Sequence, residues 1–294
     1  MSLGASAVQA EGDQAHANGI DIHYVEAGKG PPLILLHGGV VSTNLIWEGV
    51  PFAYASHMGT LANHFRVIAP DTRGGGRTAH PGSEEVSFDL LADDVVALID
   101  ALGLERPLIT GFSEGAITAT IVAIRNPDAV CAVVNHAGYD AFNPDSASPA
   151  MLRMMLGGSP DAIEADPDAA ARFFAQSDEM EAVFELMKAD QDGGQGPGHW
   201  KTYLDLAFPR ISKSPAYTFD DLGRISSPTL ILTGDRDNFC SVEEGVSAYR
   251  MLQHGELAIL PNTGHLITPA AIETTIEFFE RRLASPSGSA PAAS

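Results

Sequence analysis

The pentapeptide Gly-Phe-Ser-Glu-Gly at 111–115 combines residue types and a spacing that suit nucleophilic catalysis. A serine hydroxyl is a weak nucleophile at neutral pH, so it needs a positioned base that takes up its proton. Gly111 and Gly115 are small enough to permit the sharp strand-to-helix turn that exposes such a serine. The same pattern also fits an ordinary turn in which Ser113 caps the next helix. A nucleophilic Ser113 therefore requires a base and an orienting carboxylate elsewhere in the chain.

A histidine and two aspartates downstream meet this requirement. Asp235 and Asp237 lie at the end of the apolar run that begins at Pro228, and His265 follows the run that begins at Glu256. If both runs are parallel strands, their carboxyl ends lie on one rim of a sheet, where active sites form. The chain order Ser113, Asp237, His265 is then nucleophile, acid and base. Asp235 remains a second candidate for the acid.

The elements that would position these residues alternate along the chain. Runs that are apolar on both faces occur at 32–38, 66–74, 106–111, 131–138, 228–235 and 256–264. Segments with helical periodicity lie between or after them, at 87–103, 114–126, 241–253 and 268–283. Such runs are typical of strands buried between two layers of helices. The alternation predicts an α/β fold whose mostly parallel central sheet is flanked by helices.

Local signals mark the ends of some elements. Asn18-Gly19, followed by alternating residues, predicts a hairpin at the edge of the sheet. Ser87 is placed to cap the helix predicted at 87–103, and Gly103 is placed to end it.

The segment 141–224 breaks the alternation because it has no buried-strand pattern but has Met- and Phe-rich helical stretches. We expect a helical lid at 141–224, inserted into an α/β core formed by 17–140 and 225–284. Within it, the glycine-rich 190–198 predicts a flexible joint. Residues 1–16 are expected to be flexible, and the low-complexity 285–294 to be disordered.

Four motifs together resemble those of the α/β-hydrolase superfamily. They are His-Gly-Gly at 37–39, the loop 70–78, the pentapeptide around Ser113, and the pair formed by 234–237 and 264–265. The resemblance extends from about Gly19 to Leu283. It implies a cofactor-independent serine hydrolase in which Ser113 attacks an acyl carbon, His265 moves protons and Asp237 fixes its tautomer. The family's spacing favours Asp237 over Asp235. It also implies an oxyanion hole formed by the backbone amides of Gly39 and Glu114.

Glu114 places a carboxylate directly beside the nucleophile. In this respect the chain looks most similar to the valacyclovir hydrolase-like branch, which carries an acidic residue at this step. The resemblance implies that Glu114 binds the amino group of an aminoacyl ester. An acidic residue at this position also stabilises the first turn of a helix, which needs no substrate.

Two further residues are candidates for substrate binding. Trp47 follows the His-Gly-Gly loop, and His136 ends the run at 131–138. Trp47 as a buried aromatic and His136 as a hydrogen-bonded packing residue are equally consistent with the sequence. His37 is expected to be a structural donor rather than a second base.

Composition narrows the classes of partner. The net charge of −21, from 38 acidic and 17 basic residues, opposes binding to nucleic acid or anionic membranes. No apolar run approaches the roughly 18 residues that span a bilayer, and no basic leader precedes an apolar stretch, so a cytoplasmic protein is expected. The two cysteines and ten histidines have no metal-binding spacing, so no metal is expected. A monomer and a homodimer both remain open.

The leading hypothesis is hydrolysis of a small carboxylic ester through an acyl-enzyme, with an amino-acid or other cationic acyl ester as one candidate substrate. A hydrolase of C–C bonds and a cofactor-free haloperoxidase or perhydrolase are alternatives on the same triad. A small-molecule receptor on a hydrolase scaffold is an alternative of another class. Dehalogenases and epoxide hydrolases of this superfamily need a carboxylate where Ser113 stands.

Overall fold

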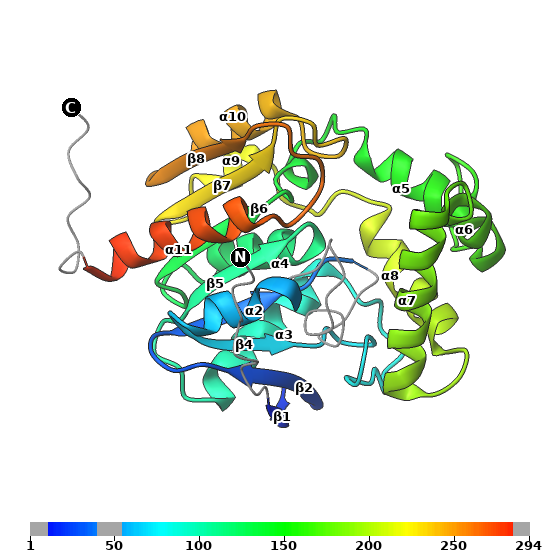
Figure 1. Cartoon of the computed structure of the whole chain (residues 1–294), viewed down its shortest axis with the longest axis horizontal. Helices are drawn as coiled ribbons and strands as arrows, with labels where there is room; N and C mark the ends of the chain where they lie inside the picture. The colour runs from blue at the N-terminus through cyan, green and yellow to red at the C-terminus, as the bar shows by residue number, and fades with distance from the viewer. Residues whose placement is uncertain (1–10, 40–54, 285–294) are drawn as a thin grey trace, which may run out of the picture.

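A computed structural model of the chain describes residues 11–39 and 55–284. Within these residues one eight-stranded sheet runs through the molecule in the order β1-β2-β4-β3-β5-β6-β7-β8 (Figure 1). From β4 through β3 to β8, neighbouring strands pair in parallel. The strands are β1 (Glu11–Ala17), β2 (Ile20–Ala27), β3 (Pro32–Leu36), β4 (Arg66–Pro70), β5 (Leu108–Phe112), β6 (Ala132–His136), β7 (Thr229–Gly234) and β8 (Gly255–Leu260).

The edge of the sheet is a hairpin at the predicted turn. The expectation that 1–16 is flexible was wrong for 11–16, because these residues pair with β2 as part of β1. Strands β1 and β2 pair antiparallel, with Ala17 opposite Ile20, and β2 pairs antiparallel with β4. Asn18 has φ 47° and Gly19 has φ 76°. Positive φ at both central residues suits a two-residue hairpin, because that backbone twist matches the twist of the strands. The Asn-Gly signal therefore located the turn correctly.

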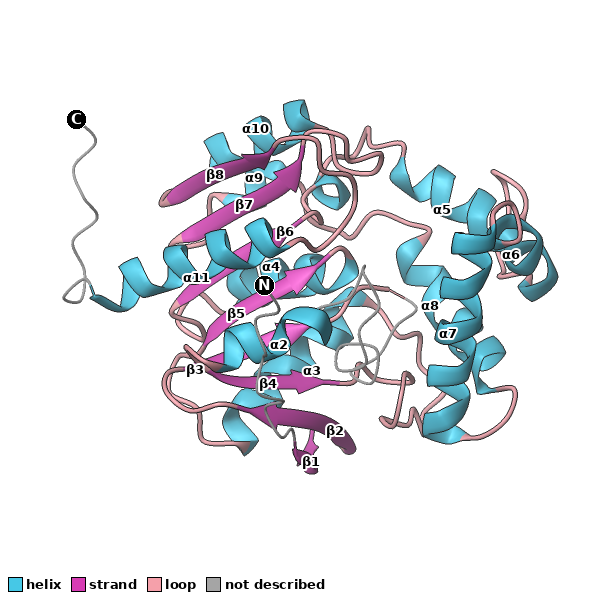
Figure 2. Cartoon of the chain, viewed as in Figure 1, coloured by secondary structure: helices cyan, strands magenta, loops and turns pink. Residues whose placement is uncertain are grey.

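Helices cover both faces of the sheet (Figure 2). On one face α2 (Ala55–Ala62) packs beside α11 (Pro269–Ala284), and on the other α3 (Phe88–Ala101) packs beside α4 (Glu114–Arg125), with α9 (Phe219–Leu222) and α10 (Val242–Met251). The predicted cap is present, since Ser87 Oγ accepts a 3.2 Å hydrogen bond from the Leu90 amide. The predicted fold class is confirmed. None of the helices described is long and apolar enough to cross a membrane.

The central strands are buried on both faces, and Leu33 and Ile34 of β3 have no exposed surface. Several predicted strands end earlier than their apolar runs. The run at 66–74 is a strand only over Arg66–Pro70, and that at 256–264 only over Gly255–Leu260. The remaining residues form loops at the carboxyl ends of the strands, which is where the candidate site lies.

Between β6 and β7 the chain leaves the sheet and forms a short 3-10 helix (Asp140–Phe142) and the helices α5 (Ser148–Gly157), α6 (Pro167–Phe174), α7 (Asp178–Gln195) and α8 (His199–Ile211). We call α5 to α8 the helical insertion. It lies beyond the carboxyl ends of the strands (Figure 1). It has an apolar core of its own, which includes Leu156, Phe184, Leu204 and Phe208.

The prediction of a flexible joint at 190–198 was wrong for most of that stretch. Helix α7 continues through Gly193 and Gly194 to Gln195. Gly76 donates its amide to Gln191 Oε1 at 2.8 Å, and Gln195 Nε2 donates to the Gly76 carbonyl at 3.1 Å. These tertiary hydrogen bonds to the core outweigh the poor helix propensity of the two glycines.

Candidate active site

Ser113 lies at the junction of β5 and α4, in a conformation that side chains rarely adopt (φ 52°, ψ −116°). The flanking glycines make this turn sterically possible. A Cβ on Gly111 would come within 2.2 Å of the Gly115 carbonyl carbon, and one on Gly115 within 2.4 Å of the His37 carbonyl oxygen. Strand, turn and helix are thus packed too closely for any side chain at these two positions. This is the context in which a Gly-x-Ser-x-Gly pattern exposes a nucleophile.

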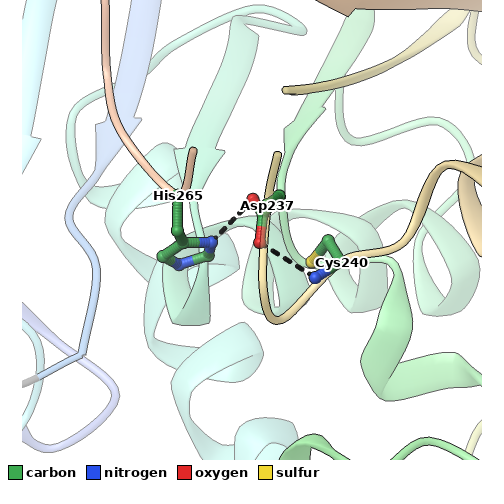
Figure 3. Close-up of side chains that lie close together, drawn as sticks. All are labelled: Asp237, Cys240 and His265. Carbon is green, nitrogen blue, oxygen red and sulfur yellow. Dashed lines mark hydrogen bonds and ion pairs between the residues drawn. The ribbon is translucent and has the colours of Figure 1, made fainter. Parts of the chain in front are cut away.

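Asp237 and His265 meet in the loops that follow β7 and β8. His265 Nδ1 and Asp237 Oδ2 are 2.8 Å apart (Figure 3). The other oxygen, Oδ1, accepts the amides of Phe239 at 2.8 Å and Cys240 at 2.9 Å. Asp235 instead accepts the Thr263 amide at 3.2 Å. Of the two candidate acids, the structure brings Asp237 to the histidine.

The surroundings of Asp237 keep its carboxylate charged. Burial raises its pKa, but the hydrogen bond from His265 and the two backbone amides outweigh burial, so the pKa lies below its ordinary value. With Nδ1 bound to a carboxylate, Nε2 of His265 is the nitrogen left to exchange protons with a substrate or nucleophile. The pair can therefore act as an oriented general base.

Ser113 and His265 line the same cavity of about 290 Å³, together with Gly39 and Glu114. In the part of the chain that the structure describes, the Ser113 hydroxyl forms no hydrogen bond, and its link to His265 is this shared cavity. Most of the wall is apolar and comes from both the core and the insertion; it includes Phe88, Leu152, Met155, Phe174, Met187 and Phe239. The site thus places a serine and a histidine at the base of a small, largely hydrophobic chamber.

The predicted oxyanion donors lie on opposite sides of the nucleophile in sequence and border the same chamber. Glu114 is the first residue of α4, where amides have no acceptor within the helix. Gly39 follows His37, whose Nδ1 donates to the Gly38 carbonyl at 2.7 Å and whose Nε2 accepts the Thr72 amide at 3.2 Å. His37 therefore holds the base of its loop, as the sequence suggested.

Of the other predicted substrate-binding residues, His136 is not found among the described residues of the cavity wall. His136 is 3% exposed, packs edge-on against the Phe112 ring at 5.0 Å and is not among the lining residues. Burial, followed by the nearby His265, lowers its pKa to about 3. It is a neutral packing residue in this structure, so its assignment to substrate binding is not carried further. Trp47 lies outside the described residues.

Two buried ionisable residues beside the site were not predicted from the sequence. Arg210 of α8 donates from Nε to Glu114 Oε1 at 2.5 Å, across 96 positions of sequence. Asp140 lines the cavity and accepts a hydrogen bond from Cys240 Sγ at 3.0 Å. Burial raises the pKa of Asp140, and hydrogen bonds from Cys240 and Ser148 offset only part of that effect. Neither residue has a motif that could have revealed it, because each contact forms only when distant segments pack together.

Asp237, Cys240 and His265 are the described residues whose ligand atoms are close enough to hold a metal ion, all within 4.8 Å of one another (Figure 3). Each is already engaged. Asp237 binds His265 and two amides, and the Cys240 thiol donates to Asp140. Burial also raises the pKa of that thiol, which opposes the thiolate that a metal needs. We assign no metal to this group.

The family model for the alpha/beta hydrolase fold matches residues 31–268. The chain belongs to this family. It is accordingly a hydrolase of the α/β-hydrolase type.

Similarity to individual proteins is more distant. The chain is 24% identical to a putative carbamate hydrolase RutD from Agrobacterium fabrum, over 80% of this chain and 87% of the relative. It is 25% identical to a 2-hydroxy-6-oxo-6-phenylhexa-2,4-dienoate hydrolase from Burkholderia cepacia, over 83% and 84%. A solved hydrolase of the latter name from Rhodococcus superposes with a TM-score of 0.72 at 17% identity, covering 95% of this chain and all of that one. At this level of identity, the superposition shows similarity of fold.

Proposed function

We propose that this protein is a cofactor-independent serine hydrolase that cleaves a small carboxylic ester through an acyl-enzyme. Ser113 attacks the acyl carbon while His265 takes its proton, and Asp237 orients and stabilises the imidazolium. The amides of Gly39 and Glu114 bind the oxyanion. His265 then returns the proton to the departing alcohol and activates the water that releases the acid.

One observation supports this proposal above the others. A strained serine at a strand-to-helix turn and a histidine bonded to a charged aspartate, which come from three separate loops, border a single cavity. Strain in the backbone is kept only where the surrounding structure enforces it, and such positions cluster at functional sites. An ordinary capping serine would need neither the strain nor the histidine.

The acyl group is proposed to be neutral and apolar rather than cationic. Glu114, the residue expected to bind a substrate amine, already pairs with Arg210, and its side chain is 6% exposed. A carboxylate that is neutralised in this way offers little to a second cation. The apolar wall favours a hydrocarbon group, and the insertion that contributes Leu152 and Met155 is proposed to act as the lid.

The test is a panel of chromogenic esters with short acyl chains, assayed with the wild type and with Ser113→Ala. We expect a burst of product from the wild type, labelling of Ser113 by an organophosphonate, and a fall in kcat of about 10⁴-fold or more in the variant. The variant should fold normally. Ester cleavage that survives in Ser113→Ala would refute the assignment of the nucleophile.

Hydrolysis of C–C bonds is the second candidate, favoured by the named activity of the Burkholderia relative. An anionic dienoate would need a cation at the site. Lys213 is the basic residue found among the described lining residues, but its side chain is 62% exposed and 3.7 Å from Glu85. The ester hypothesis is therefore the stronger one. Loss of absorbance from a 2-hydroxy-6-oxohexa-2,4-dienoate, faster than turnover of every ester in the panel, would reverse this order.

A further inference from the structure

The carboxylate of Glu114 lies where negative charge is least suitable for the proposed reaction. The amide of the same residue is one of the two proposed oxyanion donors. The side chain is also beside the other donor, because a Cβ built on Gly39 would come within 2.6 Å of Glu114 Oε2. Oε2 is buried and has no hydrogen-bond partner among the described residues. An unbalanced carboxylate here would oppose an oxyanion that forms between the two amides.

The charge that balances Glu114 comes from the insertion. The Arg210 side chain is 1% exposed and reaches Glu114 from α8. Its other nitrogens donate to the Leu206 carbonyl at 3.0 Å and to the Tyr203 hydroxyl at 3.4 Å. Burial alone would lower the pKa of Arg210, but the Glu114 carboxylate and the Tyr203 hydroxyl outweigh burial. The pKa therefore lies above its ordinary value, and the guanidinium stays charged. The arginine is thus held by its own helix and aimed at the carboxylate.

We propose that Arg210 is a positioning residue for catalysis. By neutralising and holding the Glu114 carboxylate, it makes an acidic residue compatible with the oxyanion hole. Stabilisation of the transition state then depends on the position of the insertion against the core. Arg210 does not line the cavity, so it acts through Glu114 and not on the substrate. The inference rests on the proposed function, since it requires an oxyanion at Ser113.

The ion pair could instead merely fasten the insertion to the core, and a matched variant separates the two roles. Gln191 also joins the insertion to the core, through the Gly76 amide, but it carries no charge. Loosening the insertion through Gln191→Ala should affect substrate binding and leave the oxyanion hole intact. Arg210→Gln should instead act on the chemical step.

The experiment compares Arg210→Gln, Glu114→Gln, the double variant and Gln191→Ala with a neutral ester of the panel. We expect kcat to fall 10-fold to 100-fold in Arg210→Gln, about 1.4 to 2.7 kcal/mol, with KM changed less than threefold. Glu114→Gln should lose less kcat than Arg210→Gln, because it removes the carboxylate and keeps the backbone amide. The double variant should recover most of the loss, because it no longer carries the unbalanced carboxylate.

An alkylboronic acid supplies a readout that does not depend on turnover. Its boron accepts the Ser113 oxygen, the serine proton passes to His265, and the adduct is tetrahedral and negatively charged like the transition state. Its affinity should fall in Arg210→Gln by the same factor as kcat and should be restored in the double variant. Gln191→Ala should weaken its binding by no more than the factor by which it raises KM for the ester.

Several results would overturn the inference. They are an Arg210→Gln variant with wild-type kcat, a double variant no better than Arg210→Gln, or equal losses in Arg210→Gln and Gln191→Ala. If Arg210→Gln fails to fold, the double variant decides, because a loss of kcat above 10-fold in a folded protein that lacks the carboxylate contradicts charge compensation. A wild type that neither cleaves an ester nor binds the boronate would refute the proposed function, and the inference with it.

Discussion

The rim of the sheet and the helical insertion contribute to one cavity in different ways. On the rim, Ser113, Asp237 and His265 each lie in a short loop directly after a strand. In the insertion, Arg210 and the apolar lining residues lie on helices and carry no local signature. The rim thus holds the groups that would make and break bonds, and the insertion shapes the chamber and balances its charge. The groups proposed for the chemistry are marked by local sequence, whereas the wall of the chamber forms through the packing of distant segments.

The largest effect should separate the two aspartates of the rim. Asp237→Asn keeps the size of the side chain but removes the charge that holds His265 Nδ1–H, so kcat should fall about 10³-fold to 10⁴-fold in the ester assay. Asp235→Asn is the matched control, because the recorded partners of the Asp235 carboxylate are the Thr263 amide and, at 3.8 Å, Arg236, and not His265. It should remain within a few-fold of the wild type. Comparable losses in the two variants would show that the loop and not the aspartate–histidine contact matters.

The same contrast explains what could be predicted from the sequence. The turn at Asn18-Gly19, the cap at Ser87 and the loops that hold Asp237 and His265 were found because neighbouring residues determine them. The pair of Glu114 with Arg210 could not be found in this way. Glu114 considered alone was compatible with a substrate amine, and only its contact with Arg210 of α8 shows that its partner is part of the protein.

Two glycines of α7 show how local sequence can also predict a feature that the structure does not have. Gly193 and Gly194 indicated a joint because glycine disfavours helices. The structure keeps them in α7, where Gln191 accepts a hydrogen bond from the Gly76 amide of the core and Gln195 donates one to the Gly76 carbonyl. The low helix propensity of these glycines is outweighed by contacts with residues far away in the sequence, which cannot be read from the neighbouring residues.

A second prediction asks whether the insertion unfolds on its own. Phe279 of α11 and Phe208 of α8 are both buried, one in the main core and the other in the core of the insertion. Phe279→Ala should lower the free energy of unfolding by about 3 to 5 kcal/mol, measured by urea denaturation. Phe208→Ala should lower the global value less, because the damage is limited by local opening of the insertion.

Two further measurements accompany this pair. Limited proteolysis of Phe208→Ala should cut within the insertion while the α/β core stays intact. KM for the ester should rise because local opening of the insertion displaces the lining residues that it contributes. Phe279→Ala should show neither change at temperatures where it is folded. Equal losses of stability, without selective cleavage, would mean that the core and the insertion fold as one unit.

The smallest predicted effect is the pH dependence that His136 gives to the rim. Burial lowers its pKa to about 3, from 6.5 for the free side chain, so the unfolded chain binds a proton that the folded one excludes. Stability from this residue is therefore complete above pH 6.5 and is lost as the pH falls toward 3. Between neutral pH and pH 5 the loss should be about 2 kcal/mol. Urea denaturation across this range should show a steeper slope in the wild type than in His136→Gln, which cannot take up a proton at this position. Equal slopes of unfolding free energy against pH in the two proteins would indicate that the acid sensitivity arises from other residues. His136 would then not make the stability of the rim depend on pH.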